Sequence, residues 1–549
     1  MDDTRVKGWL RTCASLRAQR DKWSGDWDIL RDLLIPRRNA DADADADADE
    51  YSHCPEGSKC CMRLAAGFME YITPSRRPWF AFQHDAVDSE DDVKAWCGDV
   101  TRIVQESIAN SNFYTEIHEA DLDDCSLGTG CMYCPDWENG GLTFTQVPCG
   151  TFGVAEDKDK RINTLARWFK FSAVQAMEKF GRNGKIACEK IQAAYEDAGK
   201  KYDPDFTIVH LVQPRKVYDL RLAEYDGKQR PFESIYICEE SETLLQEDGY
   251  HEFPYFVPRF LKWGNGPYGL APGKAVIPAM KSLIRLNENM DTLADIAAFP
   301  RILELANQVG EVDFRAGGRT TISREAADKN FPREWASGGR YDVGQDRIEI
   351  KKREIQEAFY CDMLQVISQI DREMTATEVR AREGEKLTMF SPTFTLYTSD
   401  LSYFFKRIFG VLARADKFPP PPPSLMKENA ITKELMMALP TVRFTGKLAI
   451  ALEQIQTESS MMALQPLTDA SAAWPELLDI VKVRDLFKDY LRTSGMKEEH
   501  ITTDQELKAI DKAKQEALKA QEELAAMQGG AAAAKDGATA LSLLNKKGK

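Results

Sequence analysis

The most regular pattern of apolar positions in the chain lies between residues 276 and 298. Apolar residues recur there at steps of three, four and seven: Val276, Met280, Leu283, Met290, Ala294 and Ala297. Because an α-helix turns once every 3.6 residues, this spacing places them on one helical face. Pro278 fits only the first turn of a helix, and Pro300 must follow its end, so the pattern predicts one helix of about 30 Å.

A second and a third helix follow further along the chain. The second is predicted over 355–370, with apolar residues at the same steps: Ile355, Phe359, Met363, Val366 and Ile370. Thr375-Ala-Thr-Glu378 matches a capping box, in which the hydroxyl and the carboxylate satisfy backbone donors at a helix start. The third helix should therefore begin after Thr375. The short turn between them consists of Asp371, Arg372, Glu373 and Met374, and an ordinary helical hairpin explains it equally well.

Residues 301–353, between the first two helices, have a different texture. Glycines recur through RILELA, EVDFRAGGRTTIS, SGGRYDV and DRIEIKK, which predicts a small region of strands and loops. The region is locally basic in an otherwise acidic chain, with Arg315, Arg319, Arg324, Arg333, Arg340, Arg347, Lys351 and Lys352. It is either a solvated hairpin tip or a surface that faces an acidic partner or DNA.

The first 262 residues are predicted to form an α+β domain. Helical periodicity appears at 4–35, 90–119, 172–180 and 183–198, and strand-like alternation at 141–147, 206–215 and 233–240. The acidic run Ala40–Glu50 is predicted to be a disordered loop, because its carboxylates repel one another. After residue 392 an apolar-striped helix continues until the prolines at 419–423, and further helices precede a loose tail from about residue 529. The fold class is α+β, mainly helical.

Length and charge narrow the possible functions. A chain of 549 residues is too long for one core, so two to four domains are expected. The net charge of −15 argues against a protein that grips DNA by neutralising phosphates. No apolar run reaches membrane-spanning length and the charged N-terminus has no signal-peptide core, so we expect a soluble protein without membrane contact, made in the cytosol.

The sequence contains no recognisable motif for a metal site, a phosphate loop or a catalytic site. Cys125, Cys131, Cys134 and Cys149 contain a single C-x-x-C pair, whereas structural zinc usually needs two pairs, so core packing is favoured. The twelve cysteines are expected to be reduced. Gly269–Ala275 lacks both the spacing and the hydroxyl of a phosphate loop, and the six histidines form no known motif. We therefore expect no catalytic site, cofactor or metal.

Four stretches of the sequence carry a resemblance to a known family. They are WDILRDLLIPRR, LAAGFMEYITPSRRPWFAF, NGPYGLAPGKAVIPAMKSLIRLNENMDTLADIAAFPRILEL and REMTATEVRAREGEKLTMFSP. In this order the chain resembles the portal (head-to-tail connector) proteins of short-tailed, double-stranded DNA bacteriophages. The resemblance spans about residues 20–415, and the remainder is assigned by position alone.

The resemblance implies a ring, usually of twelve subunits, at one capsid vertex, with DNA passing along its axis. It divides the chain into a wing (1–262 and 375–470), a first stem helix (263–300), a clip (301–353), a second stem helix with channel loop (354–374), and a helical crown with tail (471–549). The channel-loop candidates are Asp371, Arg372, Glu373 and Met374. The stem-channel candidates are Lys281, Arg285 and Glu288, and the clip docking candidates are Arg315, Arg319, Arg324 and Arg340.

The function implied is that of a non-enzymatic conduit for DNA packaging and ejection, without sequence specificity. Implied partners are the terminase large subunit, tail adaptor proteins, and capsid and scaffold proteins, and the protein would belong to the virion after synthesis in the host cytoplasm. The alternatives are another virion structural protein, such as a tail adaptor or scaffold, and a cytosolic enzyme. An acidic subunit fits a conduit, because a passage in which DNA slides should not bind phosphates tightly.

Overall fold

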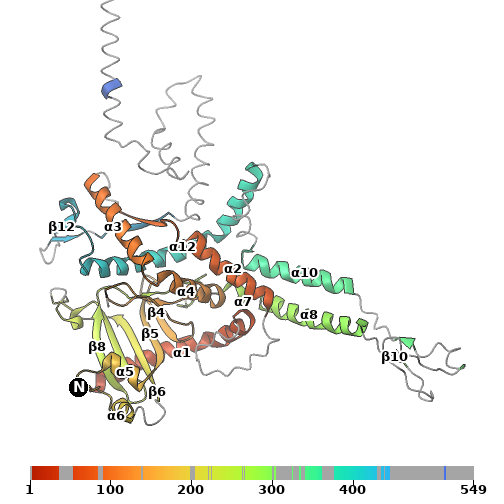
Figure 1. Ribbon diagram of the computed structural model, residues 1–549, viewed down its shortest axis with the longest axis horizontal. Coiled ribbons are helices and arrows are strands. Elements are labelled where there is room, and N and C mark those ends of the chain that lie inside the picture. The colour runs from red at the N-terminus through yellow and green to blue at the C-terminus, as the bar shows by residue number, and fades with distance from the viewer. Residues whose placement is uncertain are drawn as a thin grey trace, which may run out of the picture. The chain divides into compact units, whose positions relative to one another are not determined.

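The structure is a computed structural model of the chain, shown in Figure 1. It describes residues 3–35, 54–84, 91–137, 140–197, 204–219, 222–223, 225–262, 264, 266–298, 302–303, 324, 333–334, 341–361, 376–428, 435–437, 439–445 and 512–514. The chain divides into two units, Met1–Ala449 and Ile450–Lys549. Almost all of the described residues belong to the first unit.

Helices account for most of the described first unit, as the predicted fold class requires. They are α1 (Asp3–Leu34), α2 (Pro55–Tyr71), α3 (Asp91–Ala109), α4 (Phe113–Leu127), α5 (Ala173–Phe180), α6 (Glu189–Asp197), α7 (Pro272–Ala275), α8 (Ile277–Ala298), α10 (Tyr341–Ala358) and α12 (Ala376–Arg414). None of the helices that the structure describes is long and apolar enough to span a membrane.

The strands form one main sheet and several small ones. The main sheet is antiparallel with the order β4-β5-β6-β7-β8: β4 (Phe152–Glu156), β5 (Ile162–Ser172), β6 (Asp205–Pro214), β7 (Phe232–Cys238) and β8 (Thr243–Tyr250). A second sheet has the order β3-β2-β9: β3 (Thr145–Gln146), β2 (Met132–Tyr133) and β9 (Tyr255–Phe256). The pairs are β1 (Phe80–Gln83) with β14 (Thr441–Phe444), β10 (Ile302–Leu303) with β11 (Arg333–Glu334), and β12 (Met426–Glu428) with β13 (Leu435–Met437).

The main sheet is covered on both faces. Helix α1 packs apolar side chains, including Val6, Trp9 and Leu16, against one face. Helices α5 and α6 cover part of the other face through residues such as Phe180 and Ile191. The sheet strands show long buried runs, because both faces are shielded from water.

Two sequence expectations in this part of the chain are wrong in detail. The single helix predicted over 90–119 is two helices, α3 and α4. The turn between them is fixed by Asn112, whose amide donates to the Phe144 carbonyl (2.7 Å) and accepts from the Phe144 N–H (2.9 Å). The long strand β5 was not predicted, because its sequence INTLARWFKFS is buried on both faces and does not alternate.

All twelve cysteines are buried free thiols, and the expectation that Cys125, Cys131, Cys134 and Cys149 pack in the core is confirmed. The four in the stretch from Cys125 to Cys149 are all buried. Burial raises the pKa of the Cys134 thiol to about 12, so this group stays a neutral thiol at ordinary pH. Within the described residues, no group of three or more histidine, cysteine or acidic side chains is placed to hold a metal ion.

Strand β1 is closed by a segment from far along the chain. Phe80 lies opposite Phe444, and Gln83 lies opposite Thr441, in an antiparallel pair. Trp79 reinforces the pair: its ring stacks on Phe444 with centroids 6.2 Å apart, and its carbonyl accepts from the Thr445 N–H at 2.8 Å. This small sheet therefore joins the first hundred residues to the end of the first unit.

Helix α12 is anchored to α4 through a buried carboxyl group. The Tyr397 hydroxyl donates to Oδ1 of Asp121 at 2.7 Å, and both residues are fully buried. Burial raises the pKa of Asp121 to about 8, partly offset by this hydrogen bond. The folded protein therefore keeps Asp121 protonated at neutral pH, whereas an unfolded chain loses that proton above about pH 4.

This difference predicts a pH-dependent stability. The contribution of Asp121 is fully present below about pH 4 and is lost as the pH rises to about 8, with a slope of up to about 1.4 kcal/mol per pH unit. Asp121→Asn has no proton to lose, so its unfolding temperature should fall less between pH 5 and 8 than that of the wild type. Thermal unfolding measures this, with the exposed Asp99→Asn as control. Parallel pH profiles for Asp121→Asn and the wild type would contradict the assignment.

Candidate functional site

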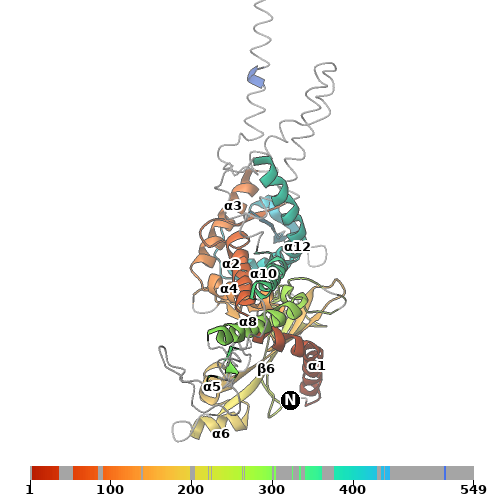
Figure 2. The ribbon, with the colours of Figure 1, turned by 90° about the vertical axis from the view of Figure 1, so that its right-hand side faces the viewer.

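Helices α8 and α10 pack side by side as an antiparallel pair, which we call the hairpin (Figure 1; Figure 2). Met290, near the end of α8, lies against Gly344, near the start of α10. A Cβ at residue 344 would stand 2.2 Å from the Met290 sulfur, so glycine allows the two helices to approach. The predicted start and end of the first helix, at Pro278 and before Pro300, are confirmed.

The second helix differs from the prediction. Residues 341–353 were predicted to be strands and loops, but they form the first part of α10, which begins at Tyr341. The secondary structure predicted for residues 341–353 is therefore wrong, whereas the boundary between clip and second stem helix at residue 353 stays a prediction. The alternation in Asp346-Arg-Ile-Glu-Ile-Lys-Lys352 imitates a strand, yet Ile348 and Ile355 are one heptad apart and share one face of α10, where Ile355 is buried and Ile348 half-buried.

The packed face of α8 was predicted largely correctly. Met280, Leu283 and Met290 are buried, whereas Ala294 is exposed. The two helices are antiparallel, and Met290 lies against Gly344, only three residues after the start of α10. Ala294, one turn further along α8, therefore lies beyond the start of α10 and has no part of α10 opposite it within the described residues.

The base of the hairpin is tightly packed. Ile355 and Phe359 are fully buried there. A Cβ at Gly273 would lie 3.0 Å from Leu34 and 3.1 Å from Phe359, so a larger residue there would require these two side chains to shift.

Polar contacts tie the same base to its neighbours. The Gln356 amide donates to Oε1 of Glu56 on α2 at 2.6 Å. Lys274 forms an ion pair with Asp26 on α1. The base is thus held by packing and by specific partners from α1, α2 and α7.

The stem-channel candidates lie on the opposite, exposed side of α8. Lys281, Arg285 and Glu288 are all exposed. At 100° per residue they share one face, about 150° away from the face that packs on α10. On α8 the acidic residues Glu288, Asp291 and Asp295 outnumber the two basic ones. The face carries both signs of charge, so it offers no purely basic track for a phosphate backbone.

Helix α10 exposes large apolar side chains. Val343 is 46% exposed and Ile350 is 59% exposed, and Tyr341 at the helix start is 53% exposed. Val343 and Ile350 are seven residues apart, so they lie on the same face of the helix. Val343 and Ile350 thus give one face of α10 an exposed apolar surface.

The remaining candidates lie mostly outside the described residues. Arg324 is described and exposed. The other clip docking candidates, Arg315, Arg319 and Arg340, and the channel-loop candidates Asp371, Arg372, Glu373 and Met374, lie outside the described residues. The capping box was predicted to start a helix after Thr375, and α12 does begin at Ala376.

Comparison with known proteins now identifies the class. The family model described as "Bacteriophage head to tail connecting protein" matches residues 7–501, which is most of the chain. The chain belongs to this family of bacteriophage head-to-tail connecting proteins, and the resemblance inferred from the sequence is confirmed.

Two curated relatives match nearly end to end. The "Probable portal protein" of Bordetella phage BPP-1 is 26% identical over 561 residues, covering 99% of this chain and 97% of the relative. The "Portal protein" of Salmonella phage epsilon15 is 24% identical, covering 97% of this chain and 96% of the relative. A chain in the virion of a native gene transfer agent (GTA) particle aligns over 75% of this chain and 86% of its own, with a TM-score of 0.34 and 11% identity. That likeness is too low to carry an argument.

The packing at the hairpin base makes a quantitative prediction. Phe359→Ala should destabilise the monomer by about 3–5 kcal/mol, because it leaves a cavity among buried side chains. Ile350→Ala, nine residues earlier and within α10 but 59% exposed, should change stability by less than about 1 kcal/mol. Urea unfolding of the two variants tests this difference, and hydrogen exchange should show faster opening of α10 in Phe359→Ala. Equal stability of the two variants would contradict the described packing.

Proposed function

We propose that this chain is the subunit of a phage portal, a ring at one capsid vertex through which DNA is packaged and later ejected. The single observation that carries the proposal is the match of the whole chain to two portal proteins and to the head-to-tail connecting family. Twelve subunits are the number that the resemblance implies.

The hairpin supports a specific role in that ring. In this proposal α8 and α10 are the stem, and neighbouring hairpins stand side by side around the axis. The exposed apolar pair of α10, Val343 and Ile350, would then be covered by the next subunit. A contact that repeats from subunit to subunit by rotation closes a ring.

The exposed face of α8 fits the wall of a passage. Lys281 and Arg285 offset part of the repulsion between acidic side chains and DNA, while Glu288, Asp291 and Asp295 prevent tight binding. A net charge of −15 over the whole chain acts in the same direction. DNA would therefore slide past this face without a preferred sequence.

The other candidates take their roles from the same proposal. The segment between α8 and α10, with Arg315, Arg319, Arg324 and Arg340, would be the clip, where the terminase large subunit and later the tail adaptors dock. Asp371–Met374, just before α12, would be the channel loop. The crown from residue 471 and the wing would face capsid and scaffold proteins, and the subunit would be made in the host cytoplasm.

Electron microscopy of the purified protein tests the ring directly. End-on class averages should show closed rings with a central passage, and counting their subunits tests the number twelve. A particle that stays monomeric under conditions favouring assembly would contradict the proposal.

The apolar pair of α10 gives a point test. Ile350→Glu places a charge in the proposed contact between stems, so the fraction of chains in rings should fall by at least about tenfold at fixed concentration. The monomer should keep its helical content, because Ile350 is exposed within the chain. Val217→Glu is the matched control, since Val217 is 86% exposed outside the hairpin. Analytical ultracentrifugation measures the distribution, and unimpaired assembly of Ile350→Glu would remove this contact from the ring.

The channel loop makes a separate prediction. Deletion of Asp371–Met374 should leave ring assembly intact while reducing DNA packaging or retention in an in vitro packaging assay. Rings with normal packaging would argue against a role for this loop in the channel. Loss of folding would show instead that the turn is purely structural.

A further inference from the structure

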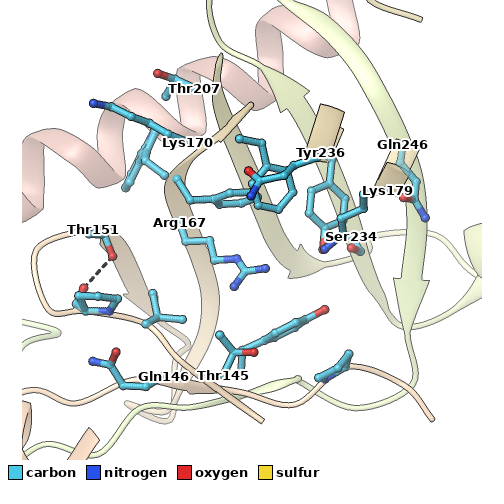
Figure 3. Close-up of a pocket in the computed structure, with 18 of the residues that line it drawn as sticks. Thr145, Gln146, Thr151, Arg167, Lys170, Lys179, Thr207, Ser234, Tyr236 and Gln246 are labelled. Carbon is cyan, nitrogen blue, oxygen red and sulfur yellow. Dashed lines mark hydrogen bonds between the residues drawn. The ribbon is translucent and has the colours of Figure 1, made fainter. Parts of the chain in front are cut away.

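A large cavity lies beside the main sheet, away from the hairpin. Its volume is about 1660 Å³, and it is lined by β5, β7 and β8 and by the segment that includes Thr145 and Gln146. Figure 3 shows Arg167 between that segment and the strand that carries Ser234 and Tyr236. Nothing in the portal role described above uses this cavity.

Arg167 is the unusual group in the cavity. It lies on β5 with only 9% of its surface exposed. Within the part of the chain that the structure describes, no carboxylate forms an ion pair with it, and its Nε has no hydrogen-bond partner. A guanidinium carries five donors and stays charged at every ordinary pH, so a buried one normally has acceptors.

Aromatic rings hold Arg167 in place without satisfying its donors. The guanidinium carbon lies 4.5 Å from the centre of the Tyr133 ring and 4.9 Å from that of Phe169. Such cation–π contacts favour the charge and fix its plane. They supply no oxygen acceptor, and the buried Nε has no hydrogen-bond partner, so the guanidinium is held in place but incompletely paired.

The neighbouring polar groups are already paired with one another. The Tyr133 and Tyr250 hydroxyls are 2.6 Å apart, and the Tyr255 hydroxyl is 2.8 Å from Nδ1 of His210. Nε2 of His210 is 2.9 Å from the Ser234 hydroxyl. Burial, together with the nearby Arg167, lowers the pKa of His210 well below its usual value, so the imidazole is neutral. Arg167 is thus a fixed positive charge among neutral, mutually bonded groups.

The rim of the cavity indicates the kind of anion. Basic and acidic side chains are mixed there: Arg17, Arg20, Lys170 and Lys179 with Asp136, Glu178, Asp205, Glu239 and Asp248. These carboxylates would repel a multiply charged phosphate chain or a nucleic acid. A single carboxylate matches the planar fork of a guanidinium through two parallel hydrogen bonds, and the aromatic walls suit an apolar body attached to it.

We propose that this cavity binds a carboxylate, with Arg167 as its anchor. The carboxylate has two possible sources: a small carboxylic acid, or an aspartate or glutamate side chain of a second copy of this chain. The second source rests on the proposed ring, whereas the first is independent of it.

The test uses the full-length protein and benzoate as the probe, because benzoate combines a planar carboxylate with an aromatic body. The thermal unfolding midpoint should rise with benzoate and saturate, relative to chloride at the same ionic strength. Arg167→Met should abolish this rise, while the protein without benzoate is as stable as the wild type or more so. Arg167→Lys keeps the charge but loses the fork, so it should bind at least about tenfold more weakly. Arg102→Met, at an exposed arginine on α3, is the control and should behave like the wild type.

The outcomes separate the two sources. A saturable effect of benzoate that needs Arg167, with a weaker effect of phosphate, supports a small carboxylic acid. If benzoate has no such effect, but Arg167→Met lowers the ring fraction severalfold relative to Arg102→Met, the carboxylate comes from a second copy. An equal response to phosphate would overturn the assignment to a carboxylate, and so would the absence of both effects.

If Arg167→Met does not fold, the comparison of Arg167→Lys with the wild type decides in the same way. Benzoate binding without any rings would overturn the portal proposal and leave this one standing.

Discussion

Two buried arginines, Arg259 and Arg407, connect the long helix α12 to the sheets of the first unit through ion pairs. Arg259 is 2% exposed and reaches Glu156 on β4 at 2.5 Å and Asp400 on α12 at 3.7 Å. Arg407, on α12, is fully buried and pairs with Asp136 at 2.8 Å and Glu252 at 3.2 Å. Because both guanidinium groups are buried, loss of their carboxylate partners would leave an unpaired buried charge, so these contacts strongly restrict where α12 can lie. The main sheet, the segments that carry Asp136 and Glu252, and α12 are consequently held together.

The hairpin differs from this part of the first unit, because only its base is packed against other elements. The base of the hairpin is fixed by Phe359, Ile355 and the close approach at Gly273, whereas its outer part exposes apolar and charged side chains alike. Packing within a single chain explains the fixed base of the hairpin, but it does not explain the apolar side chains exposed along the outer part. Under the proposed portal function, other copies would cover the exposed apolar side chains, and DNA would pass the charged ones.

The sequence predicted α8 and the start of α12 correctly, but it did not predict the start of α10 or the strand β5. The first helix of the hairpin follows from its apolar spacing and from Pro278, and α12 follows from its capping box, because both signals are local. The start of α10 was missed because alternating Ile348 and Ile350 imitate a strand, and only the packing of Gly344 against α8 decides the matter. β5 was missed for the opposite reason, since a strand buried on both faces has no alternation to detect.

The candidate sites divide along the same line. The charges on α8 were chosen correctly as exposed, because amphipathicity reports which side of a helix is packed. Nothing in the sequence singled out Arg167. An arginine in a strand is ordinary, and its lack of an acceptor appears only when β2, β5 and β9 bring rings around it from segments up to about 120 residues apart. A missing hydrogen-bond acceptor is a property of the folded structure, so the local sequence pattern cannot reveal it.

The pairing of β1 with β14 has a consequence for how the protein is made. β1 emerges from the ribosome about 360 residues before the segment that pairs with it, residues 441–444. At about 5–20 residues per second, the edge of β1 and the ring of Trp79 wait roughly 20 to 70 s for their partner. During that interval the nascent chain presents an open strand edge beside a large aromatic side chain. During that period, contacts of the open edge with other chains compete with the native pairing of β1 and β14.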